Sequence, residues 1–308
     1  MKATPMSNLF LAMYSPPGCG KTLANVRAFP EALFVAPTGA LNCASYLGYN
    51  PPRVMNANGI RNIPDIIAKA GSKVNTIVFS DLSIEADNEA KKLRTEYSGW
   101  TVWDKYGDFW LEARDAAREA QCNVIWEFHE SPPREIERGG RKVFIPGTFS
   151  LSGFKATEKI PGMMDTILRV VSDASNPIWP YVFSTEPSPD YVTKDRTNTF
   201  PARFPMNLRE PLLLAGYDLP RPKELAWMES AVEELAVRIA KEESKEDFDL
   251  NALLKGSVPS LKKRAKDPRH IRWVMSDAID RVAIRKSHAQ MLDSFIDDLT
   301  TIDDDSWE

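Results

Sequence analysis

Cysteine and histidine are scarce in this sequence. Its 308 residues contain three of each, and Cys19, Cys43 and Cys122 have neither an even count nor the short spacing of zinc ligands. This pattern excludes a disulfide framework and a cysteine-based zinc site, and it favours a reducing compartment.

The sequence also lacks long apolar runs. The longest one near the start covers residues 9–14, which is far shorter than the roughly 20 residues that cross a bilayer. No signal-peptide cleavage pattern follows it. An apolar content of 43% with 27% charged residues excludes wholesale disorder. We therefore expect a globular, cytoplasmic protein with no membrane partner.

There is no excess of basic residues, since 39 Lys and Arg stand against 43 Asp and Glu, for a formal net charge of −4. That balance argues against a uniformly basic nucleic-acid coat. The charge is segregated, however: residues 250–290 hold ten Lys and Arg against three acids, and residues 291–308 hold seven acids and no base. The basic segment is a candidate nucleic-acid surface, with solvated helix faces as the alternative. We expect the acidic tail to fold over it or to recruit a basic partner, such as a single-strand-binding or replication protein.

Apolar β-rich stretches alternate with amphipathic helical ones through roughly the first 200 residues, which indicates parallel strands joined by crossover helices. The predicted strands cover residues 9–14, 32–36, 76–80, 123–127, 166–171 and 181–184. The predicted helices cover residues 21–29, 63–70, 84–97 and 102–121 and, after a proline-rich connection at 200–222, residues 223–246 and 268–299. We expect an α/β core with a mainly parallel sheet flanked by helices at 1–221, a small helical module at 222–290 and an acidic tail at 291–308.

The most informative segment is residues 9–22, a predicted strand followed by a Pro/Gly turn and a predicted helix. It matches the pattern G-x-x-x-x-G-K-[ST] at Gly20, Lys21 and Thr22, with Ser15 in place of the first glycine. Small residues let backbone N–H groups approach a polyphosphate at the positive end of a helix. We expect Lys21 to contact the β- and γ-phosphates of ATP and the Thr22 hydroxyl to ligate Mg²⁺. The predicted nucleotide-binding residues are Ser15, Pro16, Pro17, Gly18, Cys19, Gly20, Lys21, Thr22 and Leu23.

Asp81 ends the next strong strand pattern, at 76–81. It is the expected carboxylate ligand of Mg²⁺, because the metal needs an acidic oxygen at a strand end near Thr22. The following residue is Leu82, so the Asp-Glu pair usual in AAA+ ATPases is absent. Glu85, one turn later, is a candidate to orient water, with a solvated helix start as the alternative.

A third strand pattern ends in Glu127, Phe128 and His129. Doubly wound sheets bind ligands at the carboxyl ends of their strands. We therefore expect Glu127 or His129 to sense the γ-phosphate, with an ordinary loop histidine as the alternative for His129.

A P-loop after the first strand, a single aspartate after a later one and a polar strand end recur in this order in RecA-like ATPase cores. The chain resembles the phage-encoded RecA-like nucleotide-binding proteins described as single-strand-annealing recombination ATPases. The resemblance extends over residues 8–221 and rests on segments 15–22, 77–81, 123–129, 151–165 and 194–196. It implies an oligomeric ATPase in which Lys194 and Arg196 reach the nucleotide of the neighbouring subunit; a solvated loop is the alternative for this pair.

One position departs from that family. RecA-like cores carry a catalytic glutamate just after the second strand, where this sequence has Thr38 and no acid. Either Glu85 or Glu127 then positions water, or turnover is slow. The predicted catalytic residues are Lys21, Asp81, Glu85, Glu127, His129, Lys194 and Arg196.

Residues 134–145 have the pattern of a β-hairpin, because Gly139 and Gly140 supply a turn with positive φ. By the resemblance, the loop after this strand faces a central channel and binds single-stranded DNA. Phe144 or Phe149 would then offer a stacking face, and a solvent-facing hairpin with its aromatic rings in the core is the alternative. The cations that would pair with phosphates are Arg134, Arg138, Arg141 and Lys142.

Trp100, Trp103, Tyr106 and Trp110 recur at the spacing of one helix face. Such a stripe is more often part of a core or a subunit contact than a platform for nucleic-acid bases. We expect it to be buried in one of these two ways.

The sequence thus predicts an ATP-binding and ATP-hydrolysing RecA-like protein that uses Mg²⁺ and acts on single-stranded DNA in phage recombination or replication, in the host-cell cytoplasm. An AAA+-type DNA motor or helicase loader is one alternative, favoured by the run at 16–22 and disfavoured by Leu82. A non-catalytic ATP-gated DNA-binding scaffold is another, favoured by Thr38.

Overall fold

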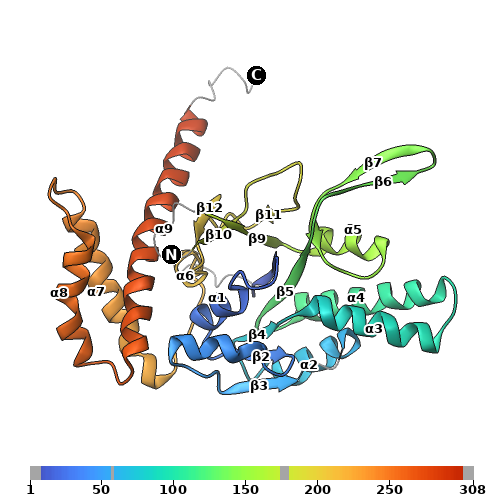
Figure 1. The fold of residues 1–308 in the computed structure, drawn as a ribbon, viewed down its shortest axis with the longest axis horizontal. Helices are drawn as coiled ribbons and strands as arrows, with labels where there is room; N and C mark the ends of the chain where they lie inside the picture. The colour runs from blue at the N-terminus through green and yellow to red at the C-terminus, as the bar shows by residue number, and fades with distance from the viewer. Residues whose placement is uncertain (1–7, 57–58, 174–179, 301–308) are drawn as a thin grey trace.

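The computed structural model describes residues 8–56, 59–173 and 180–300, and leaves the side chains at 138, 154–158 and 292–300 undescribed. Its centre is a ten-stranded sheet with the path β12-β10-β9-β1-β5-β4-β2-β3, where β8 pairs with β5 and β11 with β9 (Figure 1). Pairing is parallel from β9 through β1 to β3 and antiparallel for β8, β10, β11 and β12. The predicted α/β class with a mainly parallel sheet is confirmed. The strands are β1 (Phe10–Ser15), β2 (Leu33–Ala36), β3 (Arg53–Asn56), β4 (Thr76–Phe79), β5 (Asn123–Ser131), β8 (Thr148–Phe149), β9 (Thr166–Ser172), β10 (Tyr181–Ser184), β11 (Lys194–Asp195) and β12 (Arg203–Pro205).

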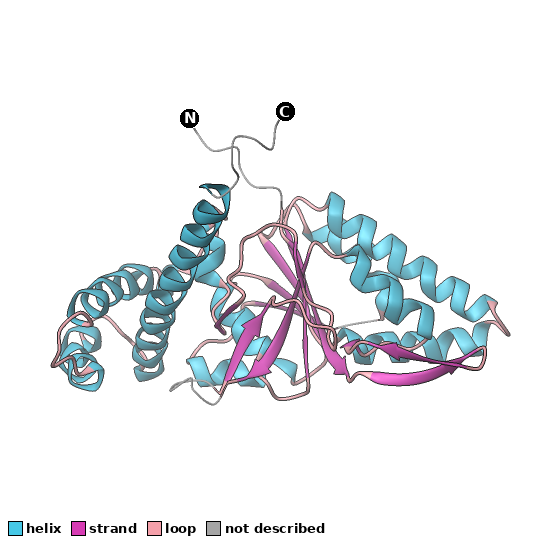
Figure 2. Ribbon diagram, turned by 90° about the horizontal axis from the view of Figure 1, so that it is seen from above, coloured by secondary structure: helices cyan, strands magenta, loops and turns pink. Residues whose placement is uncertain are grey.

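Helices cover both faces of the sheet, and β1 shows why its sequence is apolar throughout. Leu11 and Met13 pack in one core with α1, whereas Phe10, Ala12 and Tyr14 pack in a second core with α2, α3 and α4. Successive side chains of a strand point to opposite faces, so a strand covered on both sides must be apolar at every position. Figure 2 shows the sheet between the two groups of helices. The helices of the core are α1 (Lys21–Ala28), α2 (Ile63–Ala70), α3 (Leu82–Glu96), α4 (Thr101–Glu119) and α5 (Phe154–Met163).

The C-terminal helices share the first of these cores. Val232 on α7 and Trp273 on α9 belong to the same buried cluster as Val26 on α1. The helix α9 continues across the boundary expected at residue 291, and the predicted tail residues 301–308 lie outside the described residues. No helix in the described ranges is long and apolar enough to cross a bilayer. These helices are α6 (Arg209–Leu214), α7 (Trp227–Glu242), α8 (Leu250–Lys262) and α9 (Pro268–Thr300), and short 3₁₀ helices span η1 (Ala40–Leu47), η2 (Ile60–Asn62) and η3 (Lys223–Leu225).

Several elements lie outside the predicted ranges, including α6 and the short strands β8, β11 and β12. For three others, β3, α5 and α8, the reason is local. All four side chains of β3 are exposed, so this edge strand has no apolar run to reveal it. The helices α5 and α8 contain Pro161 and Pro259 in their interiors, where proline removes a backbone donor and usually ends a helix.

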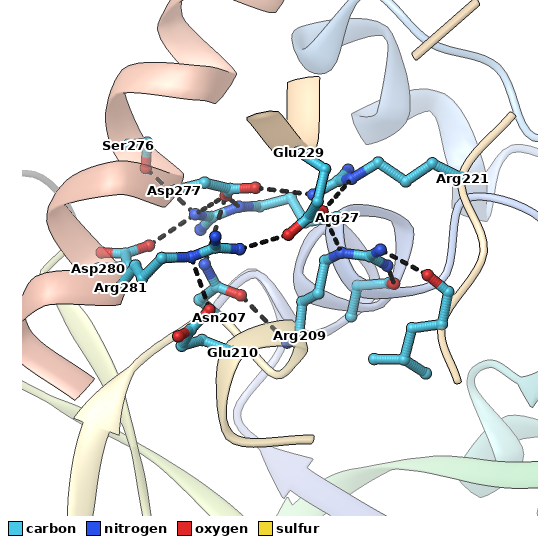
Figure 3. A network of polar contacts seen from close by, with 12 residues as sticks. Arg27, Asn207, Arg209, Glu210, Arg221, Glu229, Ser276, Asp277, Asp280 and Arg281 are labelled. Atoms are coloured by element: carbon cyan, nitrogen blue, oxygen red, sulfur yellow. Dashed lines mark hydrogen bonds and ion pairs between the residues drawn. The ribbon is translucent and has the colours of Figure 1, made fainter. Parts of the chain in front are cut away.

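A buried network of charges joins α1 to the C-terminal helices (Figure 3). Arg27 on α1 is 2% exposed, and its Nη2 lies 2.6 Å from both Asp277 Oδ1 and Asp280 Oδ2 on α9. Arg221 bridges Asp277 to Glu229 with contacts of 3.1 Å. Burial raises the pKa of Asp280 to about 6 against the opposing effect of the Arg27 guanidinium. Because charges so deeply buried are tolerated only in pairs, the network fixes α9 to the helix that follows the P-loop.

The basic segment at 250–290 is engaged by acids of neighbouring helices. Arg281 and Arg285 on α9 both contact Glu210 on α6 and Glu233 on α7, at 2.6–2.8 Å. These cations therefore hold α9 against α6 and α7. The same pattern continues in the pairs Arg264–Glu234 and Lys286–Glu243, whereas Arg269 pairs locally with Asp267.

We expect Arg27→Met to lower the free energy of unfolding by about 3–5 kcal/mol, because it leaves buried carboxylates on α9 without this partner. The matched control is Arg53→Met, since Arg53 is half exposed and lies 4.0 Å from Glu31; its effect should stay below about 1 kcal/mol. Urea unfolding followed by circular dichroism measures both. Equal effects of the two substitutions would contradict the role given to the network.

Candidate nucleotide-binding site

The loop between β1 and α1 has the backbone that its glycines predict. Gly18 has φ 81° and Gly20 has φ 88°, in the left-handed region that strains any residue with a Cβ. The backbone then enters α1 at Lys21, so the first N–H groups of the helix face the loop. This is the strand, loop and helix arrangement that binds phosphate groups in P-loop proteins.

The Lys21 side chain is folded back onto the start of the loop. It is 6% exposed, and its Nζ donates to Ser15 Oγ at 2.7 Å and to the carbonyl of Ser15 at 3.3 Å. Burial lowers the pKa of Lys21, and the Glu127 carboxylate has the largest opposing effect. Ser15, which stands where the pattern has a glycine, thus supplies a hydrogen-bond acceptor that a glycine lacks.

Glu127 lies beneath α1 and is fully buried. Its Oε2 accepts a hydrogen bond from Thr22 Oγ1 at 2.8 Å, and its Oε1 accepts one from Asn25 Nδ2 at 2.5 Å. Burial raises the pKa of Glu127, while these two hydrogen bonds oppose the rise. Both carboxylate oxygens are therefore occupied in orienting α1, which places Glu127 as a positioning residue for Thr22 rather than as a group facing a γ-phosphate.

Asn25 is the residue of this arrangement that the sequence reading missed. It is buried and lies one turn after Thr22 on the same helix face. The available signal in the sequence was a polar amide three residues after the P-loop threonine, at a position that shares a helix face with it.

Asp81 and His129 meet at the ends of β4 and β5. His129 Nε2 lies 3.3 Å from Asp81 Oδ1, and this contact holds the pKa of the Asp81 carboxyl below its usual value. The His129 backbone N–H donates to Ser83 Oγ at 2.9 Å, which ties β5 to the start of α3. Asp81 has φ 54°, a left-handed conformation that is costly for a residue with a side chain. The fold thus holds Asp81 at the strand end in a strained conformation that aims it toward His129.

A cavity of about 660 Å³ collects these groups at the carboxyl ends of β1, β4 and β5. This is the sheet edge where open α/β folds bind ligands, and the volume is that of a small-molecule site. The Thr22 hydroxyl and the Asp81 carboxylate are oxygen donors of the kind that Mg²⁺ takes from a protein beside nucleotide phosphates. The lining residues are Pro17, Gly18, Cys19, Gly20, Lys21, Thr22, Leu23, Ala24, Arg27, Ala40, Cys43, Tyr46, Asp81, His129, Pro180, Tyr181 and Met206.

Glu85 and Thr38, the residue found where RecA-like cores carry an acid, both lie away from the cavity. Glu85 is 8% exposed, and its Oε2 accepts a hydrogen bond from the Gly59 N–H at 2.8 Å. Glu85 thus anchors the loop after β3. It is absent from the lining of the P-loop cavity. Thr38, after β2, contacts Asn56 at the edge of the sheet at 3.5 Å and does not line the cavity either.

Lys194 and Arg196 lie at the opposite end of the sheet from the P-loop of their own chain. Lys194 pairs with Ile167, near the start of β9, and β9 runs parallel to β1, which ends at the P-loop. Lys194 Nζ donates to the Met164 carbonyl at 2.5 Å, whereas Arg196 is exposed. Any contact of this pair with a nucleotide must therefore involve a second subunit.

A family model described as an AAA domain matches residues 7–197. Among solved structures, the chain is similar to the KaiC-like protein PH0186 from the hyperthermophilic archaeon Pyrococcus horikoshii OT3, with 10% sequence identity, a TM-score of 0.37, and 63% of this chain and 86% of that chain covered. No curated protein matches the chain. The family model spans more than half of the sequence and includes the P-loop, Asp81 and His129, so the chain belongs to this AAA domain family.

Proposed function

We propose that the chain is a Mg²⁺-dependent ATPase that works as an oligomer on single-stranded DNA. The observation that carries the proposal is the convergence of Lys21, Thr22 and Asp81 on one cavity. Lys21 and the loop N–H groups would bind the β- and γ-phosphates, and Thr22 with Asp81 would hold Mg²⁺, which neutralises phosphate charge when bound. The protein's contribution is then chiefly positioning and charge neutralisation of an in-line attack by water.

His129 is the group we assign to orienting that water. It lines the cavity, and its imidazole is held by Asp81 at 3.3 Å. Glu127 has both oxygens engaged by Thr22 and Asn25, and Glu85 faces another loop. A neutral imidazole can accept a hydrogen bond from water with one ring nitrogen while the other is held.

The β-hairpin of β6 (Arg134–Arg138) and β7 (Arg141–Ile145) supports the DNA-binding part of the proposal. Its register pairs Arg138 with Arg141 and Glu137 with Lys142. Alternation along the strands puts Arg134 and Arg141 on one face, without an acid between them. Lys142 shares the other face with Glu137 and Glu135, and its Nζ lies 3.6 Å from Glu135.

The two aromatic candidates near the hairpin differ in what they offer to DNA. Phe144 is 47% exposed on β7. Phe149 is fully buried and stacks on Phe128 with ring centroids 4.3 Å apart. Phe144 pairs with Glu135 and therefore lies on the face opposite Arg134 and Arg141, where it does not extend the arginine face. Phe149 cannot stack a base because its faces are covered by the core.

We place the protein in recombination or replication of phage DNA within the host cytoplasm. The support is the resemblance of segments 15–22, 77–81 and 194–196 to phage-encoded recombination ATPases. An AAA+-type DNA motor is a second candidate, favoured by the AAA domain match. A non-catalytic, ATP-gated scaffold is the third, favoured by the absence of Glu85 and Thr38 from the cavity lining.

Lys21→Ala should weaken ATP binding by at least about tenfold, since each hydrogen bond to a charged group contributes about 1.5–3 kcal/mol. Titration calorimetry with ATP and Mg²⁺ measures the change. The matched control is Lys73→Ala, because Lys73 is exposed and lies outside the cavity lining. ATP affinity retained in Lys21→Ala would overturn the nucleotide assignment.

Arg141→Ala should weaken single-stranded DNA binding and reduce the slope of log affinity against log salt by about 0.7, because one phosphate contact is lost. Lys142→Ala is the control on the opposite face of the hairpin and should change the slope less, because Lys142 lies there beside Glu135 and Glu137 and not beside Arg134 and Arg141. Fluorescence anisotropy with a labelled oligonucleotide over a range of salt measures both. The same loss in both variants would argue against the arginine face as the binding surface.

Arg196→Ala should leave ATP affinity unchanged and remove the part of ATP hydrolysis that grows with protein concentration, because the side chain acts on the nucleotide of a neighbouring subunit. Arg203→Ala is the control, an exposed arginine on β12 that pairs with Glu186 at 2.7 Å. Phosphate release over a protein concentration series measures the effect. Unchanged turnover of Arg196→Ala at high concentration would exclude the contact between subunits.

A further inference from the structure

The first position of the P-loop pattern is a serine, and its hydroxyl lies against the P-loop lysine. Ser15 is fully buried at the end of β1, and Lys21 Nζ donates to its Oγ at 2.7 Å. The contacts of the same Nζ with the carbonyl oxygens of Ser15 and Pro16 are longer, at 3.3 Å and 3.4 Å. An ammonium group carries three N–H donors, and these three oxygens can accept all of them.

The Ser15 hydroxyl is oriented to accept this hydrogen bond. Its Oγ donates its own proton to the Pro16 carbonyl at 2.8 Å, which leaves its lone pairs for Lys21. Hydrogen bonds from a charged donor are stronger than those between neutral groups. Lys21 is only 6% exposed, so water is poorly placed to replace a lost acceptor. The hydroxyl therefore contributes to holding the Lys21 ammonium in its folded-back position.

Nucleotide binding draws on the same three donors of Lys21. The lysine of a P-loop reaches the β- and γ-phosphates, so an N–H that turns to a phosphate oxygen gives up a contact with the loop. A glycine at the first position of the pattern would offer Lys21 a carbonyl oxygen alone. Ser15 offers a second and nearer acceptor. Its hydroxyl thus opposes phosphate binding in a way that the usual glycine does not.

Ser15 acts on a nucleotide through Lys21, without touching the phosphates itself. It is absent from the lining of the P-loop cavity, whereas Pro17, Gly18 and Lys21 belong to that lining. Its hydroxyl proton is already engaged by the Pro16 carbonyl. Burial and geometry therefore favour Ser15 as a competitor of the phosphates over Ser15 as one of their ligands.

We propose that the Ser15 hydroxyl lowers the affinity of the site for nucleotides by competing with the β- and γ-phosphates for the Lys21 ammonium. The proposal rests on the assignment of the cavity to a nucleotide and adds the residue that tunes its affinity. It predicts the direction of the effect. Removing a phosphate ligand weakens nucleotide binding, whereas removing a competitor strengthens it.

The test is titration calorimetry of the full chain with ATP and Mg²⁺, with Ser15→Ala as the variant, since alanine removes only the hydroxyl. We expect Ser15→Ala to bind ATP about five- to tenfold more tightly, because one hydrogen bond from a charged group no longer has to be broken. The matched control is Ser184→Ala. Ser184 is a buried serine at the end of β10 whose Oγ accepts from the Glu186 N–H at 3.2 Å, and its loss should leave ATP affinity unchanged.

Urea unfolding with and without ATP separates this role from a purely structural one. The contact between Ser15 and Lys21 stabilises the chain only while no phosphate occupies Lys21. Ser15→Ala should therefore lower the unfolding midpoint without ATP and leave the midpoint at saturating ATP unchanged. A serine that only packs the end of β1 would lower both midpoints equally when it is replaced.

Equal or weaker ATP binding by Ser15→Ala would overturn the proposal, and so would an equal loss at both midpoints. Either result would leave the nucleotide assignment intact, because the unchanged chain would still bind ATP. A failure of the unchanged chain to bind ATP would instead overturn the nucleotide assignment on which the proposal rests.

Discussion

The position of the P-loop helix depends on buried carboxylates at both of its ends. Near its start, Thr22 and Asn25 donate to Glu127 on β5, and near its end Arg27 is clamped by Asp277 and Asp280 on α9. A charge placed in a protein interior is destabilising unless its partner is present in good geometry, so each contact admits little displacement. The helix that presents phosphate-binding groups is therefore fixed to the sheet at one end and to the C-terminal helices at the other.

The docking of α9 also changes the interpretation of the cations gathered at residues 250–290. A surplus of cations at 250–290 reads, in sequence, as a surface for phosphates. In the fold, Arg281 and Arg285 face Glu210 and Glu233, which come from helices distant in sequence. Part of the surplus is thus a complement to acids on α6 and α7, and this part stabilises the docking of α9. Exposed arginines at the hairpin, which a count over a whole segment does not single out, are the better candidates for DNA.

The elements that could be predicted from the sequence are those determined by residues close together in the chain. Strands buried on both faces need continuous apolar runs, and a P-loop needs its glycines and lysine in a fixed order. For this reason β1, the loop and α1 could be predicted from the sequence alone. The edge strand β3 has no such run, and the role of Glu127 depends on the pairing of β5 with β1, which brings it under Thr22 across 105 positions of sequence. The same holds for Glu85, whose partner Gly59 lies on another crossover. The roles of Glu127 and Glu85 depend on which distant segments lie beside them in the fold, and the residue type alone does not reveal this.

The central claim is that the cavity around Lys21, Asp81 and His129 is a site of ATP hydrolysis and not only of ATP binding. Steady-state phosphate release by the full chain with Mg²⁺, with and without single-stranded DNA, tests this most directly. The account predicts turnover that requires Mg²⁺ and rises when single-stranded DNA is added. ATP binding without phosphate release in either condition would contradict it and leave the protein as an ATP-gated scaffold.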